Sequence, residues 1–142
     1  IVSTGALKKK ELNELVKIKN NKLILLHCVS SYPLKDEDVN FNKFQYLKSK
    51  FKKVGYSGHS SHILDATWAI ANNAYLVEKH FTVNNSLKGR DNKFAILPNT
   101  LNKLIQFRDF HYSSNSKKTL DLQECEKDIY KNYRHRWRLN EK

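Results

Sequence analysis

His59 and His80 are the residues of this chain whose types and positions best suit metal chemistry. Each ends an apolar stretch that predicts a strand, VGYSGH and AYLVEKH, and residues 63–73 between them predict a helix. The carboxyl ends of consecutive strands in an α/β barrel lie at one shared face, so the two imidazoles could bind one metal ion there. Two protein ligands would leave most coordination positions open, and the metal could then polarise a carbonyl as a Lewis acid.

The elements that must position these histidines follow a strict alternation. Strands are predicted at residues 1–5, 22–29, 54–59 and 74–82, and helices at residues 7–19, 41–51 and 63–73. The stretch KLILLHCV is almost continuously apolar, as in a parallel sheet buried on both faces. The βαβαβαβ order predicts an α/β fold of about four parallel strands with right-handed crossovers.

The length suggests only part of a barrel. A complete eight-stranded α/β barrel takes roughly 250 residues, whereas this chain has 142 residues, contains no Met and begins at Ile1. We therefore expect a piece of a longer protein. Residues 1–112 are predicted to be the C-terminal portion of a barrel, and residues 113–142 a linker and a charged, partly helical tail.

One long segment separates the last predicted strand from the helix that Pro98 opens. Residues 83–97 are polar and contain a glycine, and the segment is too long for an ordinary turn. Loops of this kind often carry function. We expect it to be a functional loop.

The net charge of +12 invites a nucleic-acid or membrane-surface interpretation. However, the lysines and arginines are spread along every segment and no known nucleic-acid module contains them. We therefore expect a solvated surface and no nucleic-acid partner, with part of the charge available to an anionic small substrate.

No apolar run approaches the ~18 to 20 residues of a membrane span, and no signal peptide is apparent. Cys28 and Cys125 form no disulfide framework, which fits a reducing cytoplasm.

Four motifs in order and spacing carry a family resemblance. LLHCVSSYP, VGYSGHS, EKHFT and GRDNKF followed by LP resemble consecutive signatures of the sialic acid synthases, a family that includes legionaminate, pseudaminate and 9-phosphate relatives, and IVSTG resembles the preceding strand. The resemblance covers roughly residues 1–110. It implies a TIM barrel that condenses phosphoenolpyruvate with an N-acetylated hexosamine, usually N-acetylmannosamine, releases phosphate and requires Mn²⁺ or Mg²⁺.

The resemblance also implies a role for each candidate residue. His59 and His80 would be catalytic as the two protein ligands of the metal. The implied substrate contacts are Ser3, Ser30 and Ser57 for phosphoenolpyruvate, Tyr32 and Asp91 for the amino sugar, and Glu78 as a neighbouring contact. A serine hydroxyl can donate to phosphate or carboxylate oxygens without adding negative charge, and a carboxylate or phenol suits sugar hydroxyls.

Structural alternatives stay open for these residues. The serines could cap backbone groups, Asp91 could be a surface carboxylate, and Tyr32 could simply pack before Pro33. His27 precedes its strand end and is expected to be structural, whereas His62, His111 and His135 carry no motif and are expected to be solvated.

The chain also departs from the family pattern. Gly58 stands where the family usually has Asp, and Arg90 where it usually has Pro. The N-terminal barrel strands, with further substrate residues, and the C-terminal antifreeze-like domain are not recognisable. We therefore expect the chain to associate with a complementary N-terminal barrel half or with itself, because unpaired sheet edges are avoided. The alternatives are a non-catalytic barrel remnant or binding module and, more remotely, a basic nucleic-acid-associated protein.

Overall fold

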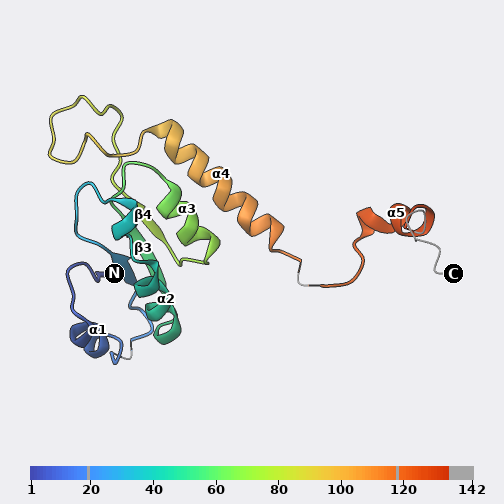
Figure 1. The fold of residues 1–142 in the computed structure, drawn as a ribbon, viewed down its shortest axis with the longest axis horizontal. Helices are drawn as coiled ribbons and strands as arrows, with labels where there is room; N and C mark the ends of the chain where they lie inside the picture. The colour runs from blue at the N-terminus through green and yellow to red at the C-terminus, as the bar shows by residue number, and fades with distance from the viewer. Residues whose placement is uncertain (19, 118, 135–142) are drawn as a thin grey trace.

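Four parallel strands pair in chain order to form one sheet in a computed structural model of the chain, which describes residues 1–18, 20–117 and 119–134 (Figure 1). The strands are β1 (Val2–Ser3), β2 (Leu25–Cys28), β3 (Val54–Gly58) and β4 (Val77–Lys79). Every neighbouring pair is parallel. The predicted α/β fold with four parallel strands is therefore confirmed.

Helices connect the strands as the alternation predicts. α1 (Lys9–Leu15), α2 (Phe41–Lys50) and α3 (Leu64–Ala71) follow β1, β2 and β3, and α4 (Pro98–Ser114) follows β4. A short 3-10 turn, η1 (Asp36–Asp38), precedes α2. Each crossover helix returns the chain to the same end of the sheet, so all four strands deliver their carboxyl ends to one side.

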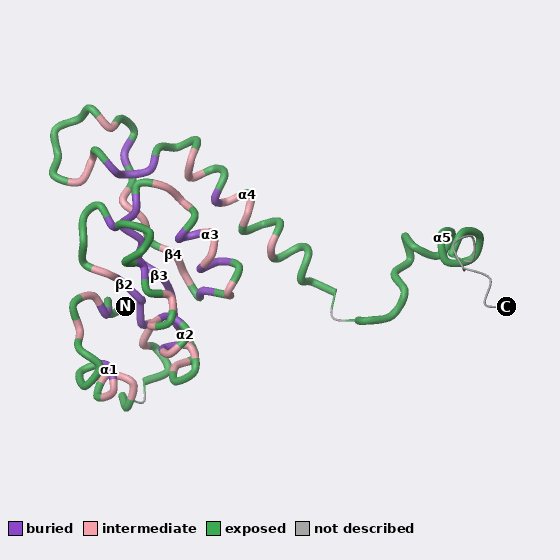
Figure 2. Tube along the Cα trace, in the orientation of Figure 1, coloured by how far each residue is buried: buried purple, intermediate pink, exposed green. Residues whose placement is uncertain are grey.

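The main core lies between the sheet and the helices. Leu25, Val54 and Tyr56 of the strands pack with Phe44 and Leu47 of α2, and all five are buried. Burying such a side chain completely contributes about 1.5–3 kcal/mol, so these contacts fix how α2 lies on β2 and β3. Figure 2 shows the buried stretches concentrated along the sheet and the helices beside it.

Strand alternation assigns the remaining side chains to the opposite face of the sheet. Successive strand residues point to opposite faces. Because Tyr56 points toward the helices, Ser57 points away from them, and so does its register partner Glu78. The face without helices therefore carries the polar side chains at the ends of β3 and β4.

Some boundaries differ from those predicted. α1 ends at Leu15, because its last apolar residues instead form a turn in which the amides of Lys17 and Ile18 bond to the carbonyls of Glu14 and Leu15. At the other end of the chain, α4 continues through Ser114 into the segment predicted as a linker.

The tail is partly helical, as predicted. Its described part forms η2 (Glu124–Glu126) and α5 (Lys127–Asn132), and residues 135–142 lie outside the described residues. Every described residue from 119 to 134 is exposed, and Figure 1 shows α5 well away from the sheet. Among the described helices, none is long and apolar enough to cross a membrane.

Candidate metal centre at the strand ends

His59 and His80 occupy equivalent places at the ends of adjacent strands. β3 and β4 pair in the register Ser57 with Glu78 and Gly58 with Lys79, so the residue that follows each strand meets its counterpart. The two imidazole centroids lie 5.3 Å apart. A metal about 2.1 Å from one nitrogen of each ring would lie about 3.2 Å from each centroid, so rings at this separation can share one ion.

The surroundings of His59 prepare one of its nitrogens for coordination. Nδ1 lies 2.8 Å from the carbonyl oxygen of Val29, so Nδ1 carries the proton and donates it. Metal-binding histidines commonly donate their second ring N–H to a carbonyl in this way, which leaves Nε2 with a free lone pair. Burial lowers the pKa of His59, but the contacts with Cys28 and the Val29 carbonyl outweigh burial and leave the pKa above its usual value. The raised pKa favours a second proton on the ring, at Nε2, and a metal ion would have to displace that second proton.

Aromatic rings surround the histidine pair. The ring of Tyr32 lies 4.3 Å from that of His59 and 5.8 Å from that of His80, centroid to centroid. The buried Phe94 packs edge-on against His80, with centroids 5.2 Å apart. Tyr32 is half exposed, so it covers the pair from the solvent side while remaining accessible to a ligand.

The predicted functional loop returns to the strand end from which it departs. The amide of Ile96 donates to the carbonyl of His80 at 2.8 Å, and the amide of Thr82 donates to the carbonyl of Ile96 at 3.0 Å. This closure carries Asp91 back over the site, where its Oδ2 lies 3.8 Å from Nδ1 of His80. The structure thus brings Asp91, Tyr32 and both histidines together.

A shallow pocket lies beside the histidines. It has a volume of about 240 Å³ and is lined by Ser57, Glu78, Lys79 and His80. Within it, the hydroxyl of Ser57 donates to Oε1 of Glu78 at 2.7 Å. Glu78 is exposed, so its carboxylate can accept a further hydrogen bond from a ligand in the pocket.

Cys28 lies where the remaining predicted serines converge, and sequence reasoning gave it no role. Burial raises the pKa of its thiol, but contacts with His59, Ser3 and Ser30 outweigh burial and lower the pKa overall. A Cβ added to Gly5 would collide with Oγ of Ser30 and lie 3.0 Å from Sγ of Cys28. Only glycine therefore leaves room for this cluster.

The other histidines lie apart from the pair. His27 is fully buried, and its Nε2 lies 2.8 Å from the carbonyl of Val39, which fits the expected structural role. His62 was expected to be solvated, but it is only half exposed and lies 2.7 Å from Oδ1 of Asp36. Nε2 of His111 lies 3.2 Å from Oδ1 of Asn73, and His135 lies outside the described residues.

The described residues contain no group of three or more His, Cys, Asp or Glu side chains arranged to hold a metal ion. His59 and His80 are thus a pair of nitrogen donors. Such a pair suits an ion that takes its other ligands from water or substrate.

Comparison with known proteins gives consistent matches. Residues 1–118 match the NeuB family. The N,N'-diacetyllegionaminic acid synthase of Legionella pneumophila is 42% identical over 85 residues, which cover 59% of this chain and 24% of the synthase. The pseudaminic acid synthase of Campylobacter jejuni serotype O:23/36 is 41% identical over 101 residues, which cover 68% of this chain and 29% of that protein.

A solved structure matches over nearly the whole chain. The N-acetylneuraminic acid (sialic acid) synthetase of Leptospira borgpetersenii, crystallised in complex with citrate, superposes with a TM-score of 0.76 and 35% identity, covering 95% of this chain and 50% of the synthetase chain. The chain spans about a third or less of the length of its curated relatives. Because the family match covers residues 1–118, the chain belongs to the NeuB family.

Proposed function

We propose that this chain forms part of an enzyme that condenses phosphoenolpyruvate with an N-acetylated hexosamine to give a nonulosonic acid and phosphate. N-acetylmannosamine or a relative of it would be the sugar. The names of the related synthases support this reaction class, and the paired histidines carry the proposal for this chain.

His59 and His80 would hold the divalent metal, Mn²⁺ or Mg²⁺. When bound, the metal supplies Lewis-acid polarisation of the sugar's aldehyde oxygen. The attacking atom is the methylene carbon of the enol, so no protein nucleophile is required. A carbon–carbon bond would form from this methylene carbon to the aldehyde carbon, and the aldehyde oxygen would take up a proton to become a hydroxyl. Water would add to the phosphate-bearing carbon and lose its protons as the bond from that carbon to the phosphate oxygen breaks, which leaves a ketone and inorganic phosphate.

The other candidate residues would bind and orient the substrates. Ser3 and Ser30 can donate to phosphate or carboxylate oxygens from beside Cys28. Ser57 must first turn away from Glu78, because its proton is engaged there. Tyr32 and Asp91 lie next to the histidine pair and are partly exposed, so they would contact the sugar.

Metal binding tests the proposal most directly. We expect Mn²⁺, titrated calorimetrically in the presence of phosphoenolpyruvate, to bind the wild-type chain with a stoichiometry of one. His59→Ala and His80→Ala should each weaken binding at least a hundredfold, because each removes one of two protein ligands. His111→Ala, which removes a histidine on α4, is the matched control and should bind as the wild type does. A folded wild-type chain without Mn²⁺ binding, or unchanged binding in both site variants, would refute the metal site.

The partner would be a complementary N-terminal barrel half, because the sheet has unpaired edges. Ile1 and Val2 at the β1 edge are 73% and 38% exposed. We expect phosphate release from phosphoenolpyruvate and N-acetylmannosamine only when the N-terminal strands of a related synthase are supplied. Full activity of the chain alone would contradict this requirement. Metal binding without turnover in the mixture would instead favour a non-catalytic binding module, as the departures at Gly58 and Arg90 suggest.

A further inference from the structure

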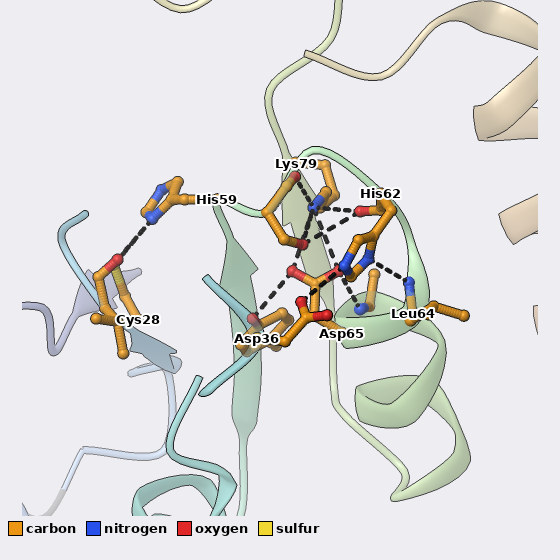
Figure 3. A network of polar contacts seen from close by, with 11 residues as sticks. Cys28, Asp36, His59, His62, Leu64, Asp65 and Lys79 are labelled. Atoms are coloured by element: carbon orange, nitrogen blue, oxygen red, sulfur yellow. Dashed lines mark hydrogen bonds and ion pairs between the residues drawn. The ribbon is translucent and has the colours of Figure 1, made fainter. Parts of the chain in front are cut away.

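A buried ion pair lies directly behind the histidines, on the helix side of the sheet. Nζ of Lys79 is 3.2 Å from Oδ2 of Asp65, and the two side chains are only 4% and 1% exposed (Figure 3). Isolated burial would be costly for either charge, so each requires the other. Burial lowers the pKa of Lys79, and the Asp65 carboxylate opposes that shift.

The pair joins the two strand ends that carry the histidines. Lys79 immediately precedes His80, and its ammonium group also donates to the carbonyls of Ser60 and His62, both at 2.8 Å. Ser60 immediately follows His59. One ammonium group therefore binds the end of β4 to the turn after β3, as Figure 3 shows.

Asp65 is itself fixed in position. It lies in the first turn of α3, and its Oδ2 accepts a hydrogen bond from the buried Tyr56 hydroxyl at 3.0 Å. Its Oδ1 accepts one from the amide of Ala66 at 2.8 Å. The carboxylate thus cannot shift without disturbing β3 or the start of α3.

Gly58 provides the space that the carboxylate occupies. A Cβ added to Gly58 would lie 2.5 Å from Oδ2 of Asp65, 2.7 Å from Cε1 of the Tyr56 ring and 3.0 Å from Cδ of Lys79. A side chain at position 58 and the carboxylate of Asp65 therefore compete for one volume. An Asp at position 58, at the end of β3, would place its carboxylate in that volume and close to the ammonium group of Lys79.

We propose that Asp65 and Lys79 are positioning residues that set the separation of His59 and His80, with Asp65 supplying from α3 the carboxylate that an Asp at position 58 would otherwise supply. The histidines' role as ligands rests on the proposed function. The geometric part of the inference, that the pair holds the two rings together, does not.

A carboxylate exchange tests this arrangement in the full 142-residue chain. Asp65→Ala should weaken Mn²⁺ binding at least tenfold, as loss of a residue supporting metal ligands typically does. Gly58→Asp should also weaken it, because the new side chain then collides with the Asp65 carboxylate and with the Tyr56 ring. In the double variant Gly58→Asp/Asp65→Ala only the Tyr56 ring still has to shift, and the affinity should return to within about threefold of wild type. A double variant no better than Asp65→Ala would overturn the proposal.

A variant without charges separates positioning from mere stability. Asp65→Leu/Lys79→Met replaces the buried pair with apolar side chains, an exchange that often preserves stability. We expect an unfolding temperature near that of wild type but Mn²⁺ affinity at least tenfold weaker, because the turn after His59 is no longer bound to β4. Undiminished affinity would show that the pair has no positioning role. Asp65→Leu/Lys79→Met and Gly58→Asp/Asp65→Ala together test the positioning role even when Asp65→Ala alone does not fold.

A measurement without metal distinguishes this inference from the proposed metal site. With ring centroids 5.3 Å apart, proton NMR of the metal-free wild-type chain should show a nuclear Overhauser effect between the His59 and His80 rings. That signal should be lost in Asp65→Leu/Lys79→Met and recovered in Gly58→Asp/Asp65→Ala. If wild type shows the signal but binds no Mn²⁺, the metal site fails and the positioning role stands. If the signal persists without the pair, the positioning role fails.

Discussion

Acidification should destabilise this protein through His27. The imidazole is fully buried, and its Nδ1 has no hydrogen-bond partner among the described residues. Burial lowers the pKa to about 4 from the ordinary 6.5; the Val39 carbonyl opposes this shift, and the nearby Lys43 adds to it. The unfolded chain therefore takes up a proton near pH 6.5, whereas the folded chain takes one up only near pH 4.

The difference between the pKa values of His27 in the folded and unfolded chain sets how the free energy of unfolding changes with pH. Above pH 6.5 both states hold His27 neutral, and this residue adds no pH dependence. Between pH 6.5 and 4 the unfolded state binds more protons, so the free energy of unfolding falls as the pH falls. The pKa difference of about 2.5 corresponds to a total loss of about 3 kcal/mol.

Urea unfolding at several pH values between 7.5 and 4 would measure this loss. His27→Gln provides the comparison, because its amide can still donate to the Val39 carbonyl but does not titrate. We expect wild type to lose about 3 kcal/mol more than His27→Gln over this range, while other acid-sensitive groups affect both proteins equally. His111→Gln should behave as wild type. Parallel stability curves for wild type and His27→Gln would refute the reasoning.

Three further changes have defined outcomes. Gly55→Ala places a Cβ 2.6 Å from the Leu76 carbonyl oxygen, so we expect a loss of about 1–3 kcal/mol in urea unfolding; an unchanged midpoint would contradict the packing. Tyr56→Phe removes a hydrogen bond to the buried Asp65 carboxylate and should cost about 1.5–3 kcal/mol, whereas a neutral change would mean that this bond is not formed. A chain shortened to residues 1–116 should keep its unfolding temperature, because residues 119–134 are exposed; a marked decrease would reveal tail contacts.

The sequence predicted the sheet well because burial makes its pattern strong. KLILLHCV and the apolar stretches before His59 and His80 read as strands, and the strand–helix alternation required them to be parallel. Parallel pairing then brings the two histidines together without any knowledge of side-chain packing.

Contacts between distant elements were harder to foresee. The pairing of Asp65 with Lys79 joins α3 to β4, and no local pattern distinguishes it from two surface charges. Cys28 was placed only in an apolar strand, because its polar contacts come from Ser3 on β1 and from Ser30 beyond the end of β2. The length of α1 depended on a turn at its end that periodicity does not encode.

The loop closure at His80 separates the position of the histidine from the sequence of the loop that follows it. Residues 83–95 are closed off by two backbone hydrogen bonds, from the Thr82 amide to the Ile96 carbonyl and from the Ile96 amide to the His80 carbonyl. The side-chain amide of Asn85 braces the interior by donating to the carbonyls of Asn92 and Ala95. Because the cost of closing a loop grows only slowly with its length, such an insert can be lengthened or rewritten while its anchor points stay in place. Under the proposed function, a new choice of sugar could evolve within this segment, with His80 left undisturbed on its strand.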